Sequence, residues 1–331
     1  MRKSLVFGLL FIAAASAVQG KEWQAAAGAQ SGDRGSQALA FLPNELWVYA
    51  GDSIRWTFPT HEIHTVTFLT PGQIRPAFQA GCPGMTPDGS SFDGTSCVNS
   101  GTYCTEAVGS CSVSGQSYSV SFPVAGNFKL VCLVHAEMTG VVHVLNLSEP
   151  LPQDQSSYDT EASSERTMLL TYASRLGRRV AREDEDQLNR AQVIAGAGAL
   201  MGTGGGSQAL SFSRFLPDSI AVHVGDTVEW TSPELARNHT ITFGKEPDDP
   251  RPPSNNLTVD SDGARHAIIS SPTDAVHSGV ISPAPQDRSM LPQSPPGVTR
   301  FRVTFKVPGT FNYICALHDE IGMKGTVIVN P

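Results

Sequence analysis

The two halves of the chain carry the same short segments in the same order, and this repeat limits the fold more than any other feature. Residues 47–57 return as residues 221–231, and residues 122–128 return as residues 305–311. A length of 331 residues allows two or three domains. Matching segments in matching order therefore predict two copies of one domain.

Each copy has the residue pattern of short β-strands. Hydrophobic and polar residues alternate, and turn residues such as Gly-Asp follow each run. Further strands are predicted at residues 117–122, 128–131, 141–145, 301–305 and 326–329. Many short strands per domain predict an all-β fold with two tandem Greek-key β-sandwiches. We place the first domain at residues 36–147 and the second at residues 207–331.

The segment between the copies, residues 148–206, has a different composition. From residue 160 to about residue 192 it lacks proline and is rich in Ala, Glu, Arg and Leu. Apolar residues recur there at helical spacing: Leu169, Tyr172, Ala173, Leu176 and Val180, with Leu188 as an extension. This pattern predicts an amphipathic helix packed against one of the domains, with dimerisation or docking as the alternative. Residues 196–207 are predicted to be a flexible linker.

The N-terminus resembles an export signal. Residues 1–20 combine a positive start, a short apolar run and a small-residue cleavage site at 15–17. A retained anchor is the alternative, although the run is short for a membrane span, and no later segment is long and apolar enough to be one. We therefore expect an exported protein, periplasmic or extracellular.

The net charge of −8 disfavours nucleic acid as a partner.

Four of the six cysteines lie within an insertion in the first copy, residues 71–115. In an oxidising compartment they predict two disulfides, and we favour Cys82–Cys97 with Cys104–Cys111 among the three connectivities. A zinc site is the alternative, but the spacings differ from paired C-x2-C motifs. The second copy has its own insertion at residues 244–297. Whether these insertions are lids or disordered loops stays open.

The repeat also duplicates a set of metal-binding side chains. Each copy has an upstream histidine and a downstream loop with Cys, His and Met: His64, Cys132, His135 and Met138, then His239, Cys315, His318 and Met323. Two histidines, one cysteine and a weak axial methionine are the ligands of a blue-copper site. Thiolate and thioether favour Cu(I), and imidazole also serves Cu(II). Zinc, the main competitor, does not usually take a thioether. We therefore predict two copper ions that cycle between Cu(I) and Cu(II).

The two loops differ in length. The first is Cys-x2-His-x2-Met and the second is Cys-x2-His-x4-Met, yet each methionine stands two residues before a glycine that opens the last strand. We expect the methionine to keep its place and the two coppers to differ in reduction potential.

In these loops the chain resembles the cupredoxins, the family of plastocyanin, amicyanin and pseudoazurin. The first loop is similar to the short amicyanin form and the second to the plastocyanin form. The resemblance covers the two predicted domains and implies electron transfer with redox protein partners. It also implies that the histidine after each cysteine, His135 or His318, is the electron port near the surface.

The main alternative is a two-domain copper enzyme, such as a nitrite reductase or a small laccase. Their additional copper centres need a histidine directly before the ligand cysteine and His-x-His pairs. Here Val131 and Ile314 precede the cysteines, and no His-x-His pair occurs. Copper storage or delivery is a second alternative, but no methionine run or Cys-Cys exchange motif is present. A structural or adhesive module is a third. We predict an electron carrier rather than an enzyme.

Overall fold

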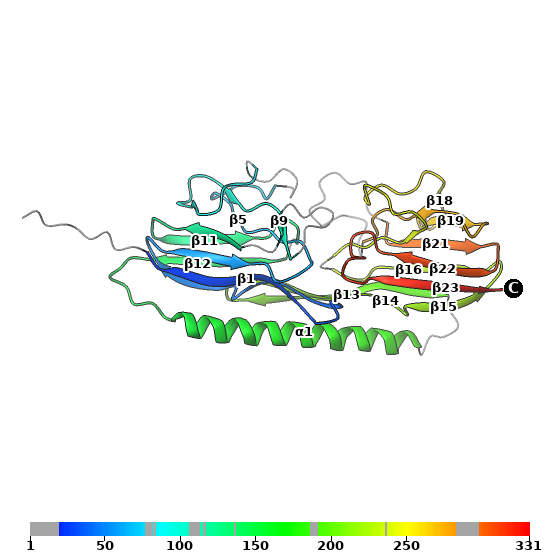
Figure 1. Cartoon of the computed structure of the whole chain (residues 1–331), viewed down its shortest axis with the longest axis horizontal. Coiled ribbons are helices and arrows are strands. Elements are labelled where there is room, and N and C mark those ends of the chain that lie inside the picture. The colour runs from blue at the N-terminus through cyan, green and yellow to red at the C-terminus, as the bar shows by residue number, and fades with distance from the viewer. Residues whose placement is uncertain are drawn as a thin grey trace, which may run out of the picture.

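The computed structural model confirms an all-β chain built of two sandwiches, with one helix in the part that it describes (Figure 1). It describes residues 20–76, 82, 84–105, 113–114, 117–135, 137–185, 191–235, 237–282 and 298–331. The predicted export signal lies outside these residues except for its last position, Gly20.

The longest sheet contains strands from both halves of the chain. Its eleven strands run in the order β18 (Thr258–Val259), β19 (Arg265–Ile269), β21 (Arg300–Phe305), β16 (Thr227–Thr231), β13 (Gln192–Thr203), β14 (Gly206–Leu216), β2 (Ser36–Leu42), β1 (Glu22–Gln30), β4 (Ser53–Thr57), β10 (Ser117–Ser121) and β6 (Ser90–Ser91).

Each half adds a second layer to its part of this shared sheet. In the first half the layer is β3 (Glu45–Tyr49), β12 (Thr139–Leu145), β11 (Gly126–Val131), β5 (Thr67–Phe68) and β7 (Val98–Asn99). In the second half it is β15 (Ser219–His223), β23 (Lys324–Asn330), β22 (Gly309–Ile314), β17 (Thr242–Phe243) and β20 (Val276–His277). A small parallel pair, β8 (Tyr103–Cys104) and β9 (Val113–Ser114), belongs to the first insertion.

Each sandwich encloses its own core. Trp56 and its repeat counterpart Trp230 are fully buried at the centres of the two clusters. Trp56 packs against Phe68 of the facing layer, and Trp230 packs against Phe243, which is the equivalent pair. The two cores are therefore built alike, as the repeat requires.

The two domains are joined by direct strand pairing. β14 runs antiparallel to β2, with Ala209 opposite Leu39 and Leu210 opposite Ala38. Ala38 and Leu39 are the repeat counterparts of Ala209 and Leu210. An internal two-fold axis would produce these central pairs, as at an isologous dimer interface.

The helix α1 (Gln155–Glu185) covers the outer face of this junction and confirms the predicted helical segment. Figure 1 shows it running along both halves of the molecule. It contacts β1 and β2 of the first domain and β13 and β14 of the second, so packing against one domain only was the wrong expectation. Leu169 and Ala173 are buried against the sheet, while Tyr172 is half exposed. Leu188 lies outside the described residues.

The predicted flexible linker at residues 196–207 is wrong. Most of it belongs to β13, which pairs with β14 and, in parallel, with β16. Its counterpart β1 pairs in the same way with β2 and β4, upstream of the predicted domain start at residue 36. Both strands are rich in Ala and Gly, residues depleted in strands, so composition pointed away from the sheet.

The described parts of the insertions extend the sheets. β6 and β19 pair with edge strands of the shared sheet, and β7 and β20 pair with β5 and β17. The disulfide Cys82–Cys97 confirms one predicted bridge. Cys104 is also disulfide-bonded, whereas its predicted partner Cys111 lies outside the described residues.

A carboxyl group on α1 makes the junction sensitive to pH. Burial, followed by the charge of Glu161, raises the pKa of Glu165 to about 7. Its Oε2 is buried without a hydrogen-bond partner among the described residues. The folded state therefore binds this proton more tightly than the unfolded chain, and stability falls as the pH rises from about 4.5 through about 7.

We predict that Glu165→Gln stabilises the protein at pH 8 and leaves stability unchanged near pH 4. After a discount for partial exposure, the gain should be about 1–2 kcal/mol. Denaturant unfolding at both pH values measures it. Asp159→Asn, an exposed acid on the same helix, is the matched control and should give no such gain. An equal effect of Glu165→Gln at both pH values would contradict the prediction.

Candidate metal centres

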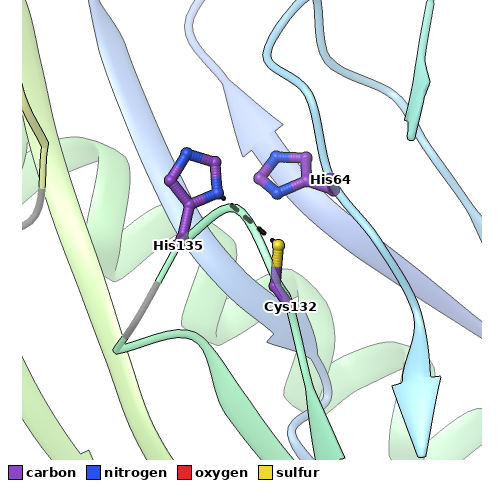
Figure 2. A group of neighbouring side chains, drawn as sticks. All are labelled: His64, Cys132 and His135. Atoms are coloured by element: carbon purple, nitrogen blue, oxygen red, sulfur yellow. Dashed lines mark hydrogen bonds between the residues drawn. The ribbon is translucent and has the colours of Figure 1, made fainter. Parts of the chain in front are cut away.

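Three predicted ligands converge in each domain. The ligand atoms of His64, Cys132 and His135 all lie within 4.8 Å of one another, and all three residues are buried. Figure 2 shows the two imidazoles and the Cys132 thiol directed toward a common point. The ligand atoms of His239, Cys315 and His318 also lie within 4.8 Å of one another, and these residues are buried too. The structure thus brings together six of the eight predicted ligands, three in each domain.

The backbone closes each ligand loop around its cysteine. In the first domain the Cys132 amide donates to the carbonyl of Met138 over 3.0 Å, and the Met138 amide donates to that of His135 over 3.1 Å. In the second, the Cys315 amide donates to the carbonyl of Met323 over 3.0 Å. Both methionines are fully buried. The longer second loop therefore leaves its methionine beside the cysteine, and axial ligation by Met138 and Met323 stays a prediction.

The insertions hold the upstream histidines. His64 exchanges backbone hydrogen bonds with Tyr103, both at 2.9 Å, and His239 does so with Ile281 at 3.1 and 2.8 Å. Two residues further on, the amides of Val66 and Ile241 donate to the hydroxyl oxygens of Ser100 and Ser278, over 2.9 and 2.8 Å.

The pairs Ser100-Gly101 and Ser278-Gly279 are thus one more repeat, which the sequence alone does not reveal. In each pair the serine hydroxyl also donates to the carbonyl of the following glycine. A two-residue match inside long insertions was too short a signal to find them.

Two glycines make room for the upstream histidines. Gly28 and Gly196 lie at irregularities of β1 and β13, with φ of +80° and +75°. A Cβ at Gly28 would stand 2.2 Å from His64 Nε2, and one at Gly196 would stand 2.2 Å from His239 Nε2. The shared sheet therefore approaches each imidazole so closely that only glycine fits.

The surroundings of the cysteines favour the thiolate. Burial raises the pKa of the Cys132 thiol, but the neighbouring imidazoles of His135 and His64 outweigh it and hold that pKa well below its usual range. The same balance, with His239 as the main favourable neighbour, lowers the pKa of the Cys315 thiol. The amides of Thr65 and Thr240 each donate to these sulfurs over 3.4 Å. Thiolate is the form in which cysteine binds metals.

These residues fit a copper ion. Both ring nitrogens of His64 are buried without a hydrogen-bond partner in the described part of the chain, which is costly unless a ligand uses one of them. The donor set of two imidazoles and one thiolate, with a buried methionine on the same loop, matches the preferences of copper.

The two sites differ in the groups around their imidazoles. Glu234 Oε2 lies 2.8 Å from His239 Nε2, and both side chains are fully buried. The repeat places Thr60 at the position of Glu234, and among the described residues no carboxylate contacts the Nε2 of His64. In the first domain it is His135 whose Nε2 meets a carboxylate, Glu62, at 3.2 Å. The sequence alone does not single out either glutamate, because only the fold brings them to the histidines.

We predict that Gly28→Ala and Gly196→Ala each abolish metal binding at one site, because the added methyl would displace the upstream histidine. Equilibrium dialysis against copper should give one bound ion fewer for each variant. Gly202→Ala on β13 is the matched control, since nothing lies within 4 Å of its added methyl. Full copper stoichiometry in Gly28→Ala or Gly196→Ala would refute the role of these glycines.

Known proteins are similar to parts of this chain. A family model described as copper binding proteins, plastocyanin/azurin family, matches residues 200–330. Oxidised plastocyanin from Dryopteris crassirhizoma is 23% identical, covers 42% of this chain and 99% of its own, and has a TM-score of 0.22. A purple cupredoxin from Nitrosopumilus maritimus is 23% identical over 42% of this chain and 98% of its own, with a TM-score of 0.19. Reduced auracyanin from Roseiflexus castenholzii is 20% identical, covers 36% of this chain and 88% of its own, and has a TM-score of 0.21.

No curated protein matches the sequence. The assignment therefore depends on the family model and on the ligand geometry within its range, which includes His239, Cys315 and His318. Over residues 200–330 the chain is similar to the plastocyanin/azurin family of copper-binding proteins.

Proposed function

We propose that the chain is an exported electron carrier that binds two copper ions, one in each domain. The observation that carries this proposal is the convergence of two buried groups of two histidines and one cysteine at equivalent places in the repeat. Export is supported by the residue pattern of the first twenty positions and by the disulfide Cys82–Cys97, which suits an oxidising compartment.

The protein contributes rigid ligand positions. Copper, when bound, accepts and releases one electron. Each cysteine follows a strand in the facing layer, each upstream histidine is fixed by an insertion, and the shared sheet presses against its imidazole. Ligands that cannot move favour neither oxidation state strongly, so little rearrangement accompanies electron transfer.

The remaining described histidines have other contacts and do not form a further metal group with one another. His143 stacks on Trp47, His266 contacts Asp260 and Thr304, and His277 contacts Thr242. The residues before the ligand cysteines, Val131 and Ile314, end strands β11 and β22. These observations favour a carrier over a multicopper enzyme, with redox proteins as partners. No helix in the described part of the chain is long and apolar enough to cross a membrane.

The first test of this function is a copper titration of the wild type, Cys132→Ser and Cys315→Ser, followed by optical and EPR spectra. We expect two blue centres in the wild type and one in each variant, because thiolate ligation produces the blue absorption. His143→Gln, which removes a histidine outside both groups, should keep both centres.

Three results of this titration would contradict the proposal. One is a wild type that prefers zinc to copper, and another is a blue spectrum that survives both cysteine substitutions. An additional type 2 copper signal would instead favour the enzyme alternative.

The second test concerns the difference between the two sites. A carboxylate that accepts a hydrogen bond from a ligand imidazole makes that imidazole more basic and stabilises Cu(II). Glu234→Gln keeps an acceptor for His239 but removes the negative charge. We predict that it raises the potential of the second site by roughly 40–90 mV, equivalent to about 1–2 kcal/mol for one electron.

Single-site backgrounds separate the two potentials. A redox titration of Glu234→Gln in the Cys132→Ser background reports the second site alone. The same substitution in the Cys315→Ser background is the control, and its potential should stay constant. An unchanged potential in the Cys132→Ser background would show that Glu234 does not tune the site.

A further inference from the structure

The two expected electron ports face the domain boundary instead of solvent. Only 5% of His135 and 7% of His318 is exposed. Each ligand loop touches the opposite domain: Arg34 donates to the carbonyl of Glu320 over 3.1 Å, and the Ser207 amide donates to the Thr139 hydroxyl over 2.8 Å. A surface role for these histidines is therefore a wrong expectation for this chain.

A buried ion pair joins the two domains at this boundary. Glu62 of the first domain reaches His135 Nε2 through Oε1, over 3.2 Å. Its other oxygen, Oε2, forms an ion pair with the guanidinium group of Arg237 in the second domain. Arg237 also donates to the hydroxyl of Ser213 on β14. The contact is buried, since only 8% of the Glu62 side chain and 1% of the Arg237 side chain is exposed.

Arg237 extends this contact to the second site. It lies two positions before the ligand His239. The chain itself therefore connects the ion pair to a ligand of the second site, and both Arg237 and His239 are buried.

We propose that Glu62 and Arg237 form an internal link through which one electron passes between the two copper sites. This inference depends on the proposed function, since it needs copper in both domains. In each event the copper of one site is oxidised from Cu(I) to Cu(II), and that of the other is reduced from Cu(II) to Cu(I). No bond forms or breaks, and no proton has to move, because the carboxylate and the guanidinium keep their charges.

The arrangement favours transfer within the chain over independent exchange at each histidine. A redox partner has little access to imidazoles of residues that are only 5% and 7% exposed. The ion pair has no net charge, so it does not repel an electron from either side. A purely structural role, in which the pair only holds the domains together, predicts a change in stability and none in electron transfer. The experiment below separates these two roles.

The test uses the full chain loaded with copper. A Met138→Leu background raises the reduction potential of the first site, so the electron should move from the second site to the first. Copper titration and EPR first establish two centres, with Cys132→Ser and Cys315→Ser as spectral references. Missing centres at this stage would refute the proposed function itself. A photochemical reductant then supplies less than one electron per protein, and optical spectra follow its redistribution.

We expect a first-order phase whose rate constant is independent of protein concentration. A redistribution rate that increases in proportion to protein concentration would overturn the proposal, because the electron would then pass between molecules. Glu62→Gln combined with Arg237→Gln should abolish the first-order phase while both centres keep their spectra. The double substitution leaves no unpaired buried charge.

The matched control is Glu22→Gln with Arg55→Gln, which removes an exposed ion pair of the first domain and should leave the phase unchanged. Arg237→Lys is the second variant if the double substitution fails to fold. It keeps the buried charge but lacks the fork that contacts both Glu62 and Ser213, so it should also slow the phase. An unaltered phase in every folded variant of the pair would refute the link.

Discussion

The pairing of β14 with β2 is the contact that the rest of the molecule depends on. It satisfies the backbone groups of two strands that would otherwise be sheet edges, where unpaired amides and carbonyls invite association with other chains. α1 covers the outer face of the same strands, where Leu169 packs beside Ala38 and Leu210. Separation of the domains would expose both the strand edges and this apolar cluster. The two sandwiches therefore have one fixed relative orientation.

That orientation places the ligand loops against each other's domains. The turn between β1 and β2 lies near the second loop, where Arg34 donates to the carbonyl of Glu320 over 3.1 Å. The turn between β13 and β14 packs on Asn44 and Thr139 of the first domain. Because these turns occupy equivalent places in the repeat, both loops are covered in the same way. His135 and His318, the histidines after the two cysteines, are both buried.

The sequence alone was sufficient for the parts of the structure that depend on local pattern. The strand repeat, the amphipathic helix and the six converging histidines and cysteines follow from spacing and residue type. The sequence did not predict β1 and β13, because Ala and Gly resemble a linker and their role is to let Gly28 and Gly196 approach a histidine. Nor did it predict the β2–β14 pairing or the contact of Glu62 with Arg237. These depend on which surfaces meet, and a single sequence does not record that.

The two copies also differ in charged residues near the imidazoles and at the domain boundary. The residues that they share build the frame: the tryptophans of the cores, the glycines under the histidines and the cysteine loops. Two of the differences place charges beside the imidazoles or at the boundary. Glu234 stands where the first copy has Thr60, and Arg237 of the second copy pairs with Glu62 of the first. Charges buried in a protein interior are costly unless they are paired. Glu62 pairs with Arg237, and Glu234 contacts His239. The repeat therefore accounts for two similar sites, and the charges between them account for how those sites come to differ.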